Sequence, residues 1–266
     1  MDNDVGYGLL YNPFAPSCRS LKNRFLSEDF KQALARAKRT VQQAGIYLLM
    51  GNPGTGLSFA TGCAADDLNA GRATVKYMTA NQVSVRDTLK QICRTVGADP
   101  AGKTRQVLIN AIAEKAISLK EQQRPLFLIV DNAQNLPQEI LEDIPFLAAG
   151  DYPAVTRMGV MLSGSRDMKE RVQQIPSLRL RVSDFYTLSG LKEEEAGPYV
   201  LHMLRAAGAA QNILDEEATR LLYTYSASGN YRILNNVMRD ALYLGQQLKQ
   251  PMIDKKILLS SATHQF

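Results

Sequence analysis

Apolar and polar residues follow two different periods between residues 45 and 188. Continuous apolar runs, or a strict apolar–polar alternation, predict β-strands, whereas apolar positions three and four residues apart predict amphipathic helices. The predicted strands are 45–50, 72–78, 125–131, 155–165 and 178–188. The predicted helices between them are 57–70, 84–96 and 105–120. Strands that alternate with helices predict an α/β fold with a parallel sheet and right-handed crossovers.

The pattern changes after residue 188, where only helical periodicity continues. The helices predicted there are 192–208, 214–226, 231–248 and 252–260. Turn sequences such as "AAGAA" and "ASGN" separate them. The sequence therefore predicts a sheet domain over 1–188, with an N-terminal extension over 1–44, and a small helical domain over 189–266.

Composition narrows the class of protein. The chain has 266 residues, of which 45% are hydrophobic and 21% charged, as in ordinary globular proteins. The longest apolar run, 126–130, is too short to cross a bilayer, and the first residues lack the pattern of a signal peptide. Three widely spaced cysteines and two histidines suggest neither disulfides nor a zinc site. These features predict a cytoplasmic protein without a membrane partner.

The net charge of +5 is compatible with nucleic-acid binding and also with an ordinary solvated surface. A basic cluster lies on one predicted helix, "SEDFKQALARAKRTVQQA", for which Ser27 is the expected N-cap. The members of the cluster are Lys31, Arg36, Lys38 and Arg39. Two interpretations stay open, a contact with the DNA backbone and a favourable arrangement of charges along the helix dipole.

A glycine-rich segment, "GNPGTGLS", follows the first predicted strand and precedes a predicted helix. It fits the phosphate-binding pattern of Gly, four residues, Gly, Lys and Ser/Thr at every position except one. The matching positions are Gly51, Asn52, Pro53, Gly54, Thr55, Gly56 and Ser58. Leu57 occupies the position of the lysine. A glycine turn without any ligand remains the alternative interpretation.

Asp131 ends the apolar strand in "LFLIVDNAQNL". An acid at the end of such a strand helps to hold Mg²⁺ beside the Ser/Thr of a phosphate loop. Ser58 and Asp131 are therefore the candidate magnesium pair. The alternative is that Asp131 only caps a helix that follows the strand.

Six segments in a fixed order resemble AAA+ ATPases of the ExeA type and their relatives TnsC and TniB, which regulate transposition. They are "YGLLYNPF", the strand and loop at 46–58, "LIVDNAQNL", "LRLRV", "LHMLRAAG" and "SGNYRILNNVMRDAL". The resemblance implies a RecA-like αβα core over 1–188, a helical lid over 189–266, and ATP and Mg²⁺ as ligands. It further implies homo-oligomeric rings or filaments, duplex DNA as a partner, and a transposase or another protein partner.

The same resemblance assigns roles to individual residues. It matches Arg181 with an arginine offered to a neighbouring subunit's nucleotide, Arg179 being a second candidate. It matches Arg232 with a lid arginine that contacts phosphates, and the turn 163–165 with a polar sensor. The alternatives are that both arginines of "LRLRV" line the solvent face of a strand, and that Arg232 is an ordinary surface residue.

Two substitutions in these motifs predict impaired catalysis. Asn132 stands where the family has the glutamate that polarises the attacking water, a contribution of typically ~10²–10⁴ in rate. Leu57 removes a lysine–phosphate contact of about 1.5–3 kcal/mol. Lys76 and Lys103 are the candidates for a substitute cation. We expect a nucleotide-binding regulator, with an active ATPase with a displaced lysine and a nucleotide-free adaptor as alternatives.

Overall fold

The computed structural model describes residues 6–16, 23–69, 73–102, 104–149 and 158–263. Its contacts divide the chain into two compact units. The sheet unit comprises Phe30–Pro53 and Leu57–Leu188. The helical unit comprises Met1–Asp29, Gly54–Gly56 and Ser189–Phe266.

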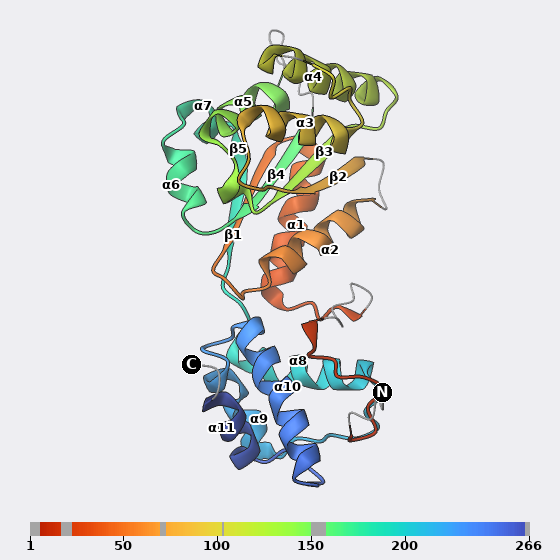
Figure 1. Ribbon diagram of the computed structural model, residues 1–266, viewed down its shortest axis with the longest axis vertical. Coiled ribbons are helices and arrows are strands. Elements are labelled where there is room, and N and C mark those ends of the chain that lie inside the picture. The colour runs from red at the N-terminus through yellow and green to blue at the C-terminus, as the bar shows by residue number, and fades with distance from the viewer. Residues whose placement is uncertain (1–5, 17–22, 70–72, 103, 150–157, 264–266) are drawn as a thin grey trace. The chain divides into compact units, whose positions relative to one another are not determined.

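The sheet unit is built on five strands in the order β2-β3-β4-β1-β5, and every adjacent pair is parallel (Figure 1). The strands are β1 Ile46–Gly51, β2 Thr74–Thr79, β3 Leu126–Asp131, β4 Met158–Gly164 and β5 Val182–Leu188. All residues of β1, β3 and β4 are buried, as expected for inner strands with helices on both faces. The predicted α/β class with a parallel sheet is confirmed.

Helices cover both faces of this sheet. The helices of the first face are α3 Val85–Val96, α4 Arg105–Glu121 and α5 Gln138–Ala148, which share one apolar core with Leu48, Leu128 and Leu162. The other face carries α1 Glu28–Gln43 and α2 Leu57–Asn69 (Figure 1). The hydroxyl of Tyr47 on β1 donates to the carbonyl oxygen of Ala33 on α1 at 3.3 Å. This hydrogen bond ties α1 to the buried strand β1.

The helical unit contains α8 Glu193–Ala206, α9 Glu216–Tyr225, α10 Tyr231–Gln247 and α11 Lys255–Thr263. Their shared core includes Leu204, Leu222, Leu234 and Leu258, which are all buried. Asp215 caps α9 by accepting a hydrogen bond from the Ala218 amide at 2.6 Å. The helices predicted after residue 188 are thus confirmed.

The segment 178–188 differs from its prediction as one continuous strand. Pro176 to Arg179 form a short helix, α7, and β5 begins only at Val182. Proline fits the first turn of a helix, where its missing N–H has no partner to lose, so Pro176 starts a turn rather than a strand. The polar stretch after β3 also contains structure that the periodicity did not predict, namely the 3-10 turn η3 Ala133–Asn135 and α5.

Among the described residues, no helix combines the length and the apolar character needed to cross a membrane.

Candidate functional site

The glycine-rich loop joins β1 to α2, as the sequence predicts. Gly54 and Gly56 have φ of +88° and +85°, a conformation that costs little for glycine but strains residues with a Cβ. Thr55 between them is buried. A loop of this kind aims backbone N–H groups at the space before a helix N-terminus, which suits an anion such as a phosphate.

Leu57 and Ser58 are the first two residues of α2. Leu57 is half-buried and Ser58 is exposed. The Leu57 carbonyl oxygen accepts a hydrogen bond from the Thr61 hydroxyl at 2.8 Å. A phosphate at this helix start would therefore meet a hydroxyl and backbone amides, but it would meet no cation from position 57.

Asp131 lies at the end of β3 and is only 3% exposed. Its Oδ1 accepts a hydrogen bond from the Ser163 hydroxyl at 3.1 Å. The Ser163 and Thr61 hydroxyl oxygens are 2.8 Å apart; because Ser163 donates its proton to Asp131, Thr61 is the donor here and shares its one proton with the Leu57 carbonyl oxygen. A buried carboxylate needs such donors, because an unpaired charge away from water is costly. Asp131 is thus tied to α2, the helix that begins with Leu57 and Ser58.

Tyr77 completes the surroundings of this carboxylate. Its hydroxyl donates to Asp131 Oδ2 at 3.0 Å. Tyr77 pairs with Ile129 across the sheet, which places it on the same face as Asp131, two residues further along β3. Burial raises the pKa of Tyr77 to about 12, and the negative charge of Asp131 adds to the shift. The sequence did not single out Tyr77; its only signal was the alternation within 72–78.

Asn132 follows Asp131 with φ of +56°, in the left-handed region that asparagine tolerates better than most residues. Its backbone begins η3, and its side chain makes no capping hydrogen bond there. Asp131 itself binds Ser163 and Tyr77, so the interpretation of Asp131 as a mere helix cap is wrong. A neutral amide at position 132 cannot take a proton from water.

The donor set fits magnesium. Mg²⁺ prefers oxygen ligands and is commonly held by one or two carboxylates together with water and substrate phosphates. Asp131 supplies one buried carboxylate, and α2 supplies the exposed hydroxyl of Ser58. Within the part of the chain that the structure describes, no group of three His, Cys, Asp or Glu residues could hold another metal.

The helical unit contains the candidate lid arginine. Arg232 is the second residue of α10 and is exposed. Its backbone N–H lies 3.0 Å from Oδ1 of the N-cap Asn230 and 3.4 Å from the carbonyl oxygen of Gly54. A Cβ on Gly54 would lie 2.1 Å from the same Asn230 Oδ1. Glycine at position 54 is therefore required by the close approach of Asn230 as well as by its φ angle.

Arg181 lies between α7 and β5 and is exposed. No residue that the structure describes forms an ion pair with it or with Arg232. Arg179 is the last residue of α7, so the two arginines do not alternate along a strand as the sequence suggested. The turn after β4 is held by the Ser165 amide, which donates to Gln134 Oε1 at 3.3 Å.

Lys76, one of the two candidates for a substitute cation, does not fill the place of the lysine. Lys76 is adjacent to Tyr77 on β2, and successive side chains of a strand point to opposite faces. Lys76 therefore points away from the face that carries Asp131. Lys103 lies outside the described residues.

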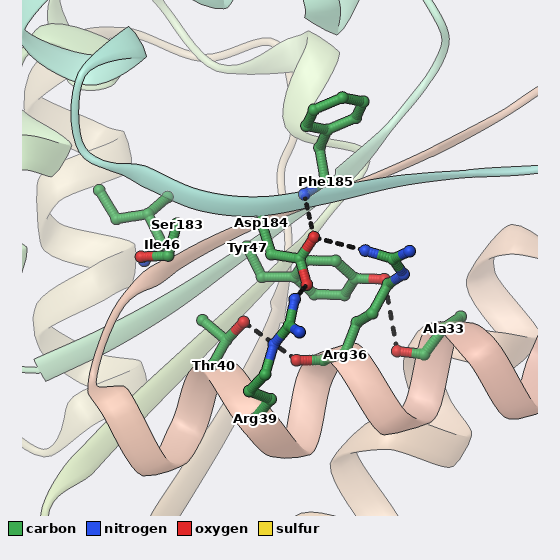
Figure 2. A network of polar contacts seen from close by, with 9 residues as sticks. All are labelled: Ala33, Arg36, Arg39, Thr40, Ile46, Tyr47, Ser183, Asp184 and Phe185. Carbon is green, nitrogen blue, oxygen red and sulfur yellow. Dashed lines mark hydrogen bonds and ion pairs between the residues drawn. The ribbon is translucent and has the colours of Figure 1, made fainter.

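Two arginines of the basic cluster of α1, Arg36 and Arg39, have a structural role (Figure 2). Arg36 Nη1 is 2.7 Å from Asp184 Oδ1 on β5, and Arg39 pairs with the other oxygen of the same carboxylate. The Arg36 guanidinium also lies 5.2 Å from the centre of the Tyr186 ring. Lys38 pairs with Asp67 at 3.8 Å. These pairs fasten α1 to the edge strand and to α2.

Neither earlier interpretation of this cluster accounts for Arg36 and Arg39. The single negative charge of Asp184 offsets one of their two positive charges, which leaves less positive potential for a DNA backbone. The last turn of α1 contains no basic residue, so no basic side chain interacts favourably with the helix dipole at that end. Glu28 and Asp29 do lie in the first turn, as expected.

A family model described as an AAA domain matches residues 38–172, which is more than half of the chain. The protein therefore belongs to the AAA domain family. This match spans the glycine-rich loop, Asp131 and Ser163. The comparison with curated proteins found no match.

Solved structures share the fold at low sequence identity. The Cdc6p protein of Pyrobaculum aerophilum has a TM-score of 0.72 at 16% identity, over 99% of this chain and 71% of its own. The ORC1 protein of Aeropyrum pernix, in complex with DNA, has a TM-score of 0.67 at 15% identity, over 95% and 68%. The ORC2 protein of Aeropyrum pernix, in ADPNP–ADP complexes, has a TM-score of 0.65 at 15% identity, over 88% and 67%. The chain thus has an AAA+ P-loop fold with a helical C-terminal part.

Proposed function

We propose that this protein is an AAA+ module that binds ATP with Mg²⁺, assembles into homo-oligomers and hydrolyses ATP slowly or not at all. The observation that carries the proposal is the link between the phosphate loop and the buried acid. Thr61 on α2, Ser163 on β4 and Asp131 on β3 form one chain of hydrogen bonds. This chain fixes the carboxylate relative to the helix that begins with Leu57 and Ser58.

Each group has a role in nucleotide binding. The loop from Gly51 to Gly56 supplies backbone N–H groups for the phosphates, and its left-handed glycines allow the close approach. Ser58 and Asp131 are the proposed Mg²⁺ ligands. Bound Mg²⁺ would neutralise charge on the phosphates. Arg232 is proposed to contact the phosphates, and its exposed side chain is compatible with that role.

Slow hydrolysis follows from the two substituted positions. Leu57 offers no charge to the transition state, and Asn132 offers no base to the attacking water. Lys76 points away from the face of Asp131 and does not compensate. We therefore favour a role in which bound nucleotide promotes assembly over a role in which its hydrolysis drives a reaction cycle.

Assembly is proposed through Arg181. It lies outside the regular strand, is exposed, and has no ion-pair partner among the described residues. An arginine with these properties is suited to reach the phosphates of nucleotide bound by a second copy. Nucleotide would then stabilise rings or filaments.

We propose a DNA-associated regulator of the ExeA and TnsC/TniB kind, with duplex DNA and a transposase or similar protein as partners. The motif order "YGLLYNPF" to "SGNYRILNNVMRDAL" supports this type, and the DNA complex of the ORC1 protein makes DNA a reasonable ligand for the fold. The paired residues of α1 are not the proposed contact. Weak contacts repeated in every subunit of an oligomer would add through multivalency.

The proposal is tested by measuring three properties on the same preparation of the full chain. ATP binding is measured by calorimetry with Mg²⁺, phosphate release by a colorimetric assay, and DNA binding by fluorescence anisotropy at two salt concentrations. We expect ATP binding, little phosphate release, and DNA binding that strengthens with ATP and weakens steeply with salt.

The alternatives give different results in these assays. Rapid phosphate release that Asp131→Ala abolishes would identify an active ATPase with another source of charge. Absence of ATP binding would identify a nucleotide-free adaptor. DNA binding that is absent under conditions of assembly, or independent of salt, would leave a protein-only partner.

A further inference from the structure

The two oxygens of the Asp131 carboxylate have donors of very different character. Oδ1 accepts from Ser163, which is fully buried and itself hydrogen-bonded to Thr61. Oδ2 accepts from Tyr77, whose residue is 41% exposed. The first donor is fixed in the core, whereas the second belongs to a partly exposed side chain, which has more freedom to rotate.

The position of Tyr77 explains this freedom. Tyr77 is on β2, which is an edge strand of the sheet, two residues before the strand ends. Tyr77 lies directly opposite Ile129 on β3, so its hydroxyl reaches Asp131 diagonally across the strand pair. Rotation of one aromatic side chain at an edge therefore breaks the Oδ2 hydrogen bond without disturbing the buried chain through Ser163.

We propose that Tyr77 controls access of Mg²⁺ to Asp131. In the metal-free protein the hydroxyl satisfies Oδ2, and a cation that uses this oxygen must displace it. Tyr77 thereby lowers the metal affinity of the site and raises the Mg²⁺ concentration at which nucleotide binds. This inference rests on the proposed function, because it assumes that Asp131 is a metal ligand.

The absence of a lysine at position 57 makes this control matter more. A phosphate loop with lysine has a permanent positive charge beside the phosphates, whereas Leu57 provides none. Mg²⁺ then supplies a larger share of the positive charge that a triphosphate meets. A residue that competes with Mg²⁺ would therefore set how strongly nucleotide binding depends on the concentration of the metal.

The size of the effect follows from the hydrogen bond. A hydrogen bond to a charged group is worth about 10- to 100-fold in an equilibrium constant. Since Tyr77 is partly exposed, water replaces part of what it loses on release, and we expect the lower end of this range. Tyr77→Phe should shift the metal midpoint by roughly tenfold toward lower concentration.

The direct test is a Mn²⁺ titration of the full chain without nucleotide, in which free Mn²⁺ is followed by electron paramagnetic resonance. The variants are Tyr77→Phe, Asp131→Asn and the two combined. Tyr243→Phe is the matched control, because Tyr243 is 63% exposed on α10 in the helical unit. We expect tighter Mn²⁺ binding for Tyr77→Phe, wild-type binding for Tyr243→Phe, and loss of binding in both Asp131→Asn proteins.

A second measurement follows the tyrosine hydroxyl itself by absorption. The chain has 11 tyrosines and no tryptophan, so its near-ultraviolet absorption reports tyrosine environments. Release of one hydroxyl from a carboxylate on addition of Mg²⁺ should give a small tyrosine difference band. This band should be present in the wild type and absent from Tyr77→Phe.

The outcomes separate the inference from the proposed function. Equal Mn²⁺ affinity of wild type and Tyr77→Phe, or weaker binding by the variant, overturns the competition while leaving the metal site intact. Unaltered Mn²⁺ binding by Asp131→Asn overturns Asp131 as the ligand and the inference with it. Mn²⁺ binding that follows the expected order without any ATP binding would retain the inference and reject the nucleotide part of the function.

Discussion

Replacing Asp184 by alanine removes the carboxylate that fastens α1 to β5. The Asp184 side chain is 9% exposed, and its partners Arg36 and Arg39 are 35% and 57% exposed. A hydrogen bond between charged groups contributes about 1.5–3 kcal/mol, and an exposed ion pair about 0.2–1 kcal/mol. The contribution of the Arg36 contact lies near the lower limit of the first range, and that of the more exposed Arg39 contact lies in the second range. We therefore expect Asp184→Ala to lower the free energy of unfolding by about 2 kcal/mol.

This value is measured by urea unfolding followed by circular dichroism on the full chain. Arg36→Ala should cost more than Arg39→Ala, and the double variant Asp184→Ala/Arg36→Ala should cost less than the sum of its parts. Arg220→Ala is the matched control, since its pair with Glu216 is 79% and 89% exposed. That change should alter stability by less than about 0.5 kcal/mol.

The reasoning would be refuted by a stable Asp184→Ala protein whose Arg36 and Arg39 variants lose DNA binding. Such a result would show that the basic face of α1 contacts the nucleic acid. Additive effects in the double variant would show that Arg36 and Asp184 do not interact in solution.

Three further predictions concern the loop, the chemistry and assembly. Gly54→Ala should lower the melting temperature and weaken ATP binding. A Cβ at this position would lie 2.1 Å from Asn230 Oδ1, and the backbone strain of alanine at φ +88° costs about 1–3 kcal/mol. An unchanged melting temperature and unchanged ATP binding would contradict this prediction. Leu57→Lys with Asn132→Glu should raise phosphate release by at least about tenfold over the unmodified chain, and no increase would show that another part of the site is missing. Arg181→Ala should reduce the larger species that light scattering detects with ATP and Mg²⁺, and equal particle sizes would exclude Arg181 from assembly.

The strands were predictable where burial on both faces leaves an unbroken apolar run. β1, β3 and β4 are of this kind, and over the described residues their predicted positions agree with the structure. Residues 155–157 of the strand predicted over 155–165 lie outside the described residues. The segment before β5 was misassigned because alternation in "LRLRV" resembles a strand, while Pro176 starts a helix that ends at Arg179. Local pattern alone does not say which of these two signals prevails.

The candidate site was predictable to the extent that it is local in sequence. The loop between β1 and α2 is defined by a short motif, and its glycines have the left-handed conformation that such a turn requires. The hydrogen bonds of Asp131 were not predictable, because they join residues 54 and 32 positions away through the strand order and register. The partner of Arg36 is 148 residues distant for the same reason.

The most direct test of the central claim is calorimetric titration of the full chain with ATP in the presence of Mg²⁺, with phosphate release followed in the same sample. We predict saturable binding that Asp131→Ala weakens by roughly tenfold or more, because the variant loses the buried carboxylate proposed to hold the metal. Phosphate release should stay near background throughout. Absence of binding, or equal binding by Asp131→Ala, would contradict the account of a nucleotide-binding AAA+ module.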